Sequence, residues 1–240
     1  MFKRVVRNYL GPHVWQRLGQ AKQEFIWGKT EVFMDSDIYK FINPMLPDSG
    51  FYVDVGAHDG RSMSNSWHLE KSRGWNGILI EPILSVFFRL RELRSLDTNI
   101  FINCACVSFE FNDVNLEMQY GDLMSFAPEI SSVERSEWTE GAKRFLRTNE
   151  QSLVTWVPAR TLQSILDESS APKVIDFLSI DVEGAELEVL CGVNFASYKF
   201  RIICVESFHP DRINELLLSK GYQFIGNIKD NLIFRAASGI

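Results

Sequence analysis

Two acidic residues stand where short apolar runs of the sequence give way to turn-forming residues. Asp54 lies in the run at residues 51–55, before the turn at residues 56–60, and Glu81 closes the run at residues 77–81. A carboxylate at a strand end accepts two charge-assisted hydrogen bonds from a ribose diol, which suits Glu81. Asp54 would face an ammonium group directly or through water. The pair therefore predicts a site for a nucleoside that carries a positive charge.

The glycines of the first turn indicate how such a ligand would approach the backbone. Gly56 can take a tight turn that a Cβ atom would hinder, and Gly60 lets a helix over residues 61–73 start close to the ligand and the sheet. The N-terminus of that helix would favour a carboxylate. The alternatives are an ordinary tight loop after a strand and, for Glu81 before Pro82, a helix-capping glutamate.

The same turn argues against a dinucleotide or a nucleoside triphosphate. His58 stands where the second glycine of G-x-G-x-x-G would let a pyrophosphate reach the backbone amides. The chain also contains no G-x-x-x-x-G-K-[ST] loop. A nicotinamide oxidoreductase and an ATP-driven phosphoryl transferase are therefore disfavoured.

A third acidic strand end supplies the reaction side of the predicted site. Asp181 and Glu183 follow the apolar run at residues 174–180, and they would point to the same side if the extended backbone continued. Either acid would serve as the base for a hydroxyl proton, with Asp181 preferred, and His209 after the fifth strand is a weaker candidate base. The alternative is helix capping at residues 184–191. Asp181 and Glu183 are oxygen ligands that a metal accepts, but no third ligand stands at a defined spacing, so we expect no metal.

The positions of these residues require alternating strands and helices, which predicts a doubly wound α/β fold with a mostly parallel seven-stranded sheet. A turn-rich Lys-Asp-Asn between two apolar runs near the end predicts a C-terminal antiparallel hairpin. The expected strands are 51–55, 77–81, 100–106, 174–180, 201–206, 221–226 and 231–235. The expected helices are 61–73, 83–96, 161–168, 184–191 and 210–219.

Two segments do not fit this pattern. Residues 1–49 form an N-terminal arm, expected to be partly helical, whose first part is basic and amphipathic and reads as a docking helix rather than a membrane anchor. Residues 109–155 form an insertion, with a strand at 114–119 and a charged helix around 133–147, that we expect to shape or cover the substrate pocket. The domain proper is expected at residues 50–240.

Composition narrows the class of protein further. The 240 residues are 45% hydrophobic and carry a formal net charge of −6, which would repel a nucleic-acid backbone. The four cysteines lack the spacing of a zinc site or a disulfide framework, and no apolar stretch has the length of a bilayer span. We expect a soluble, cytoplasmic protein without membrane association.

Three blocks of the sequence resemble the FkbM-type methyltransferase domain family. They are residues 51–60, residues 64–82 and the stretch I-D-F-L-S-I-D-V-E-G-A-E-L-E-V-L with Gly192, and weaker similarity extends the coverage to about residues 50–235. The resemblance implies a fold of the class I methyltransferases and S-adenosylmethionine as cofactor. By position, the residues implied to line the cofactor side are Asp54, Gly56, Ala57, His58, Gly60, Asn65, Glu81, Pro82, Asn103 and Asp181.

The resemblance implies methylation of a hydroxyl group on a sugar or a related small metabolite. The arm and the insertion are not among the residues that carry the resemblance, and these are the segments that would choose the acceptor. The alternative is a non-enzymatic binding or adaptor module that keeps the methyltransferase fold. Retention of both Asp181 and Glu183 favours the enzyme.

Overall fold

A seven-stranded sheet forms the centre of the part of the chain that the computed structural model describes, residues 36–95, 97–132, 138, 146 and 152–237. In spatial order its first five strands are parallel to one another, and the sixth runs antiparallel to both of its neighbours. The predicted doubly wound sheet with its antiparallel hairpin is confirmed. In spatial order the strands are β3 (Ile100–Ile102), β2 (Asn76–Ile80), β1 (Phe51–Val55), β7 (Val174–Ile180), β8 (Lys199–Glu206), β10 (Asn231–Ala236) and β9 (Tyr222–Ile228).

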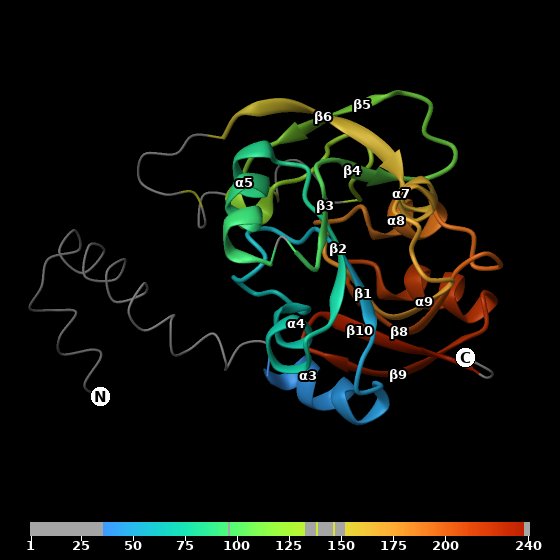
Figure 1. The fold of residues 1–240 in the computed structure, drawn as a ribbon. Coiled ribbons are helices and arrows are strands. Elements are labelled where there is room, and N and C mark those ends of the chain that lie inside the picture. Colours follow the sequence, from blue (N-terminus) through green and yellow to red (C-terminus); the bar gives the residue numbers. More distant parts are fainter. Residues whose placement is uncertain (1–35, 96, 133–137, 139–145, 147–151, 238–240) are drawn as a thin grey trace, which may run out of the picture.

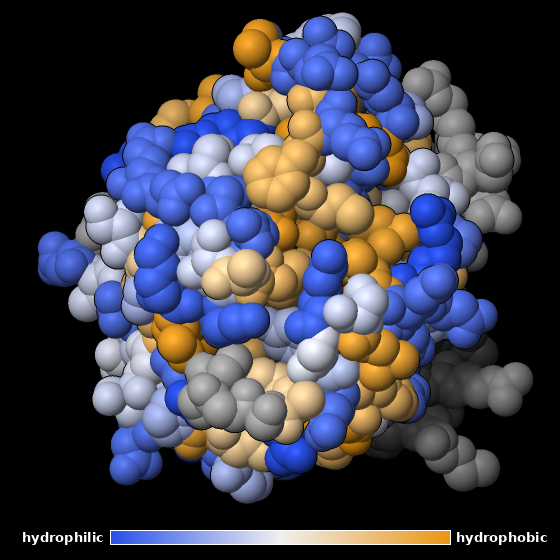
Figure 2. Space-filling model, turned by 90° about the vertical axis from the view of Figure 1, so that its right-hand side faces the viewer, coloured by the Kyte–Doolittle hydropathy of each residue, from blue (hydrophilic) through white to orange (hydrophobic). Residues whose placement is uncertain are grey.

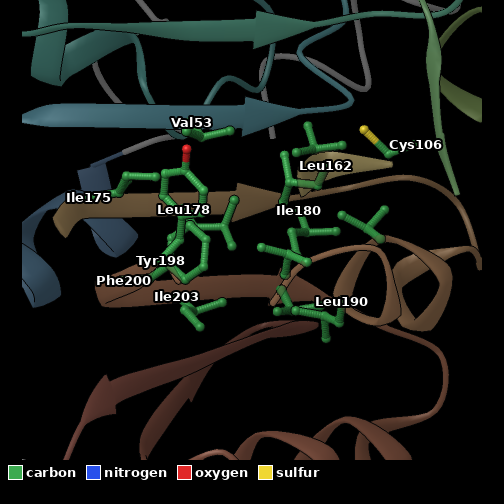
Figure 3. Close-up of a cluster of buried hydrophobic side chains, with 14 of the residues drawn as sticks. Val53, Cys106, Leu162, Ile175, Leu178, Ile180, Leu190, Tyr198, Phe200 and Ile203 are labelled. Carbon is green, nitrogen blue, oxygen red and sulfur yellow. The ribbon is translucent and has the colours of Figure 1, made fainter. Parts of the chain in front are cut away.

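Helices cover both faces of this sheet (Figure 1). On one face, apolar side chains of β1, β7 and β8 are buried together with those of α7 (Leu162–Glu168), α8 (Glu186–Cys191) and α9 (Pro210–Ser219). Figure 3 shows Leu178 and Ile203 of the strands in one cluster with Leu162 of α7 and Leu190 of α8. Each fully buried aliphatic side chain of this kind stabilises the fold by about 1.5–3 kcal/mol. The continuous apolar runs of the sequence are thus explained by burial on both faces.

The opposite face is covered by α3 (Ser36–Ile42), α4 (Trp67–Arg73) and α5 (Leu84–Leu93), whose apolar residues join a second buried cluster. Ile38 and Ile42 of α3 belong to this cluster, so the end of the N-terminal arm is part of the folded core. Arg73 donates hydrogen bonds to the carbonyl groups of Asn43, Leu46 and Pro47. The predicted basic helix near the start of the arm lies outside the described residues.

A small second sheet contains the third apolar run and part of the insertion. The run predicted as one strand at residues 100–106 is broken into β3 and β4 (Ala105–Val107), because the side chain of Asn103 turns back to the β2 end. β4 pairs with β6 (Val154–Thr161), which in turn pairs with β5 (Asn115–Gln119). The strand expected at 114–119 is confirmed, whereas β6 was not predicted because Pro158 interrupts its pattern. The charged helix around 133–147 lies outside the described residues.

The surface and the thiol groups add little that constrains function. The face of the molecule in Figure 2 is mixed, with apolar areas interrupted by polar side chains. In the described part of the chain, no helix is both long enough and apolar enough to cross a bilayer. All four cysteines are free thiols.

Candidate cofactor and active site

The predicted site residues gather around one pocket of about 900 Å³, a volume that includes the solvent space at its mouth. The main sheet contributes the turns after β1, β2 and β7, and the small sheet, which lies beyond one end of the main strands, contributes the opposite wall (Figure 1). Ligand sites in open α/β sheets lie outside the carboxyl ends of strands, as this pocket does. The predicted site residues that line it are Asp54, Gly56, Ala57, His58, Asn65, Glu81, Pro82, Asp181 and Glu183.

Gly56 brings the ends of β1 and β7 unusually close together. Its φ is +83°, and a Cβ atom there would lie 1.8 Å from the carbonyl oxygen of Asp181. Its amide and that of Ala57 both donate to the carbonyl oxygen of Ile80. Only glycine therefore allows the three strand ends to converge on one pocket.

The prediction that a helix begins directly after Gly60 is wrong. Residues 61–66 form turns, and α4 begins at Trp67. The carboxylate of Asp59 accepts hydrogen bonds from the amides of Arg61 and Ser62, at 2.9 and 2.7 Å, and so satisfies groups that a helix terminus would have offered to an anion. Gly60 lies outside the pocket lining, and a Cβ atom there would collide with Leu90 and Arg94.

Asp54 is held by hydroxyl groups at the base of the pocket. Its side chain is 3% exposed, and its Oδ2 atom accepts a hydrogen bond of 2.5 Å from Ser66 Oγ and a longer one of 3.5 Å from Ser64 Oγ. Burial raises the pKa of this carboxyl, while the Ser66 hydrogen bond and the charge of Arg94 oppose the rise. An approaching cation would favour its ionised form.

Glu81 lies on the neighbouring strand end and is fixed by the backbone. Its two carboxylate oxygens accept hydrogen bonds from the amides of His58 and Ile83, at 3.0 and 2.8 Å. Burial raises the pKa of Glu81 to about 7. Ile83 is the N-cap residue of α5, so Glu81 supports that helix while also lining the pocket. Asn103 holds the Glu81 and Pro82 carbonyl groups from outside the pocket lining.

Asp181 and Glu183 lie in an acidic part of the pocket. Burial, and then the charge of Glu206, raise the pKa of Asp181 well above its usual range and that of Glu183 to about 8. The extended backbone does not continue as expected, because Glu183 has a φ of +51°. Neither acid caps the following helix, since α8 begins at Glu186 with Ala185 as its N-cap.

His209 does not belong to this group. The structure places it at the exposed N-cap of α9, outside the linings of the two cavities described here. The sequence favoured it because it follows β8, but the turn after that strand carries it outward.

A second cavity of about 610 Å³ adjoins the first. Met63, Asn65 and Asp181 line both cavities, so these three side chains stand at the junction. The rest of its lining combines Ile38 and Ile228 with polar groups, among them Glu206 and Asn231 from the strand ends of β8 and β10. No sequence motif marked this cavity, because its walls come from segments that are far apart in the chain.

The insertion contributes residues that the sequence did not identify. Leu116 and Met118 of β5 line the pocket, and so does Asp122 in the short 3₁₀ helix η2 (Asp122–Met124). Asp122 Oδ1 lies 3.2 Å from His58 Nε2 and 3.1 Å from Arg89 Nη2. Burial alone would lower the pKa of His58, but Asp122, and after it Asp59 and Glu81, raise it to about 9. The ion pairs of Asp122 with His58 and Arg89 form a clasp. This clasp joins the insertion to α5 and to the turn at residues 56–60, which we call the cofactor turn.

No group of three or more histidine, cysteine or acidic side chains among the described residues is arranged to hold a metal ion.

One comparison with known proteins identifies the family of this chain. The family described as Methyltransferase FkbM domain matches residues 54–224. This span covers most of the α/β fold and includes Asp54, Glu81 and Asp181. The chain therefore belongs to the FkbM family of methyltransferase domains, and S-adenosylmethionine is the cofactor that this family implies.

Solved structures resemble the chain more distantly, and curated proteins give no match. A methyltransferase FkbM from Methylobacillus flagellatus KT has 16% identity and a TM-score of 0.44 over 78% of this chain, which spans 44% of that protein. A TehB-like SAM-dependent methyltransferase from Corynebacterium glutamicum has 9% identity and a TM-score of 0.43. The match covers 94% of this chain and 100% of that protein.

Proposed function

We propose that this protein transfers a methyl group from S-adenosylmethionine to a hydroxyl group on a sugar or a related small metabolite. The observation that carries the proposal is the junction of the two cavities at Asp181, a carboxylate placed between the nucleoside-binding strand ends and a polar space. We also propose that residues 50–240 form the methyltransferase domain and residues 1–49 an arm. The free thiols and the negative net charge support a cytoplasmic location without a nucleic-acid partner.

The residues of the first cavity fit the cofactor. Asp54 lines this cavity and accepts its hydrogen bonds from serine hydroxyls, so its carboxylate can attract the ammonium group of the methionine moiety. Glu81 uses one hydrogen bond on each oxygen and keeps acceptor capacity for a ribose diol. The apolar side chains of Leu116 and Met118 suit the flat face of a base. When bound, S-adenosylmethionine supplies an electrophilic methyl group on a sulfonium centre.

Asp181 takes the proton of the acceptor hydroxyl in this proposal. Burial, and then the charge of Glu206, raise its pKa, so its ionised carboxylate is a stronger base than that of an exposed aspartate. Glu183 lies close enough to perturb its pKa and orients the acceptor or shares the proton. Carboxylate and amide groups of Glu206, Asn65 and Asn231 would hydrogen-bond the other hydroxyls of the acceptor.

Calorimetric titration with S-adenosylhomocysteine tests the cofactor part of the proposal, with NAD as the control. Saturable single-site binding of S-adenosylhomocysteine, with none of NAD, is expected. Absence of binding would overturn the proposal in favour of a non-enzymatic adaptor that keeps the fold. Release of S-adenosylhomocysteine is then measured with a panel of sugars to identify the acceptor.

An Asp181→Asn variant tests the reaction part once an acceptor is found. Loss of the base is expected to lower kcat by about 10²- to 10⁴-fold, with a much smaller change in affinity for S-adenosylhomocysteine. The matched control is Asp211→Asn, which replaces an exposed acid on α9. Unchanged kcat in the Asp181 variant would exclude its role as base.

A further inference from the structure

Behind the cofactor turn lies a group of buried polar side chains that no sequence motif singled out. Its centre is Arg94, the C-cap residue of α5, whose side chain is fully buried. Arg94 Nε pairs with Glu70 Oε2 at 2.5 Å, and Nη2 donates to the hydroxyl group of Tyr52 at 2.7 Å. Asn99 completes the group by bridging Tyr52 and Glu70. The charge of the guanidinium is thus balanced within the protein.

The remaining donors of Arg94 point toward the cofactor site. Nη1 donates to the carbonyl oxygen of Gly60 at 2.8 Å, and both Nη atoms lie 3.2 Å from Ser66 Oγ. A guanidinium only donates hydrogen bonds, so the Ser66 oxygen must accept from Arg94 and give its single proton to Asp54 Oδ2, 2.5 Å away. A directed chain of hydrogen bonds therefore runs from Arg94 through Ser66 to the Asp54 carboxylate.

We propose that Arg94 is a positioning residue for the cofactor: it holds the turn at Gly60 and, through the Ser66 hydroxyl, aims the Asp54 carboxylate at the ammonium group of S-adenosylmethionine. This inference rests on the proposed function. The Glu70 partner is central to it. Because Glu70 already balances the charge of Arg94, Asp54 is polarised by the network without being neutralised, and it retains its attraction for a ligand cation.

The arrangement makes cofactor affinity depend on pH in a defined direction. Asp54 binds an ammonium group as a carboxylate, so affinity falls as pH is lowered and Asp54 is protonated. The Ser66 hydrogen bond favours the carboxylate, and its removal moves this fall to higher pH. The charged, titratable and hydroxyl groups around Asp54 are Tyr52, Glu70, Arg94 and Asp181, with the hydroxyls of Ser64, Ser66 and Ser179.

Two conservative variants of Ser66 test the chain of hydrogen bonds in the full-length protein. Ser66→Ala deletes the hydroxyl, and Ser66→Cys replaces it with a weaker and somewhat larger donor. Each is expected to bind S-adenosylhomocysteine about 10- to 100-fold more weakly at neutral pH and to lose affinity at a higher pH than the wild type does. The control is Ser108→Ala, another buried serine that lies outside both cavities. Thermal unfolding checks that all three variants are folded.

A double-mutant cycle separates positioning by Arg94 from a general effect on the fold. Arg94→Lys keeps the charge but loses the two Nη groups that together reach Gly60 and Ser66. If Arg94 acts through Ser66, the double variant of Arg94→Lys with Ser66→Ala loses less affinity for S-adenosylhomocysteine than the sum of the two single losses. Additive losses would exclude the route through Ser66, and wild-type affinity with a wild-type pH profile in both Ser66 variants would overturn the inference. If the wild type itself does not bind S-adenosylhomocysteine, the proposed function fails, and the inference fails with it.

Discussion

The acidic residues of this site differ in their environments more than in their chemistry. The pKa of Glu70 is lowered to about 2, because the charge of Arg94 and the hydrogen bond from Lys71 outweigh burial. Glu81, on the next strand and without an ion pair among the described residues, has a pKa raised by burial to about 7. The first carboxylate is structural and permanently charged. The second changes its charge near neutral pH, as a group that binds a ligand does.

Replacement of Glu81 by glutamine tests its assignment to the ribose. The amide keeps the size of the side chain but loses the charge that strengthens hydrogen bonds to a diol, so affinity for S-adenosylhomocysteine is expected to fall about 10- to 100-fold. Calorimetry gives this value directly. Glu215→Gln on exposed α9 is the control. Binding of S-adenosylhomocysteine with wild-type affinity by Glu81→Gln would rule out the assignment.

At the scale of elements, the clasp between η2 and the cofactor turn decides how the insertion sits on the pocket. Asp122 is shared between His58 of the turn and Arg89 of α5, and it has a φ of +54°. One short segment of the insertion therefore makes two ion pairs with the methyltransferase core. These ion pairs add to apolar packing of the pocket wall, because Leu116 and Met118 of β5 are buried in one cluster with Ile83 and Val86.

An Asp122→Asn variant tests this clasp. Without the Asp122 carboxylate, only Asp59 and Glu81 oppose the effect of burial at His58, so its pKa is expected to fall below about 9. Proton NMR titration of the imidazole measures this shift, and calorimetry is expected to show weaker binding of S-adenosylhomocysteine. Asp113→Asn, an exposed acid in the same insertion, serves as the control. If the His58 titration did not move, another group would be responsible for its raised pKa.

The sequence predicted the elements that depend on local pattern and missed those that depend on distant partners. Parallel strands and the hairpin follow from apolar runs and a turn, and they were placed within a few residues. The start of α4 was misplaced because the Asp59 side chain satisfies amides that the pattern assigned to a helix. Arg94 and Asp122 gave no signal, since their roles depend on contacts with residues 28 and 64 positions away, respectively Ser66 and His58. The opposite error concerns His209: its residue type suits a catalytic base, but the fold places it outside the site.

At the scale of the whole molecule, several ionisable groups have pKa values that are raised by the folded structure. Glu81 and Glu186 have pKa values raised to about 7, and Glu183 has one raised to about 8, all with burial as the main cause. His58 is raised to about 9 by its hydrogen bond to Asp122, against the effect of burial. All four bind protons more tightly in the folded than in the unfolded chain. Their effects on stability therefore have the same direction.

The stability of the ligand-free protein is expected to fall as pH rises from about 5 to about 9. A raised pKa stabilises the fold below the unfolded value, 4.5 for glutamate and 6.5 for histidine, and this contribution is lost as pH rises through the folded value. Groups with lowered pKa values, such as Glu70, are already ionised in both states above about pH 5 and leave this window unchanged.

Urea unfolding at pH 5.5, 7 and 8.5 measures this dependence, and Glu183→Gln isolates one contributor. The variant lacks the proton that folded Glu183 retains, so its unfolding free energy is expected to change less across the range, by about 1–3 kcal/mol. Glu168→Gln, an exposed acid on α7, should retain the wild-type slope. Stability that rises with pH in the wild type would mean that the acids of the pocket are ionised in the folded protein. A proton would then not be available to Glu183 near neutral pH, and the acceptor side of the site would carry a fixed negative charge.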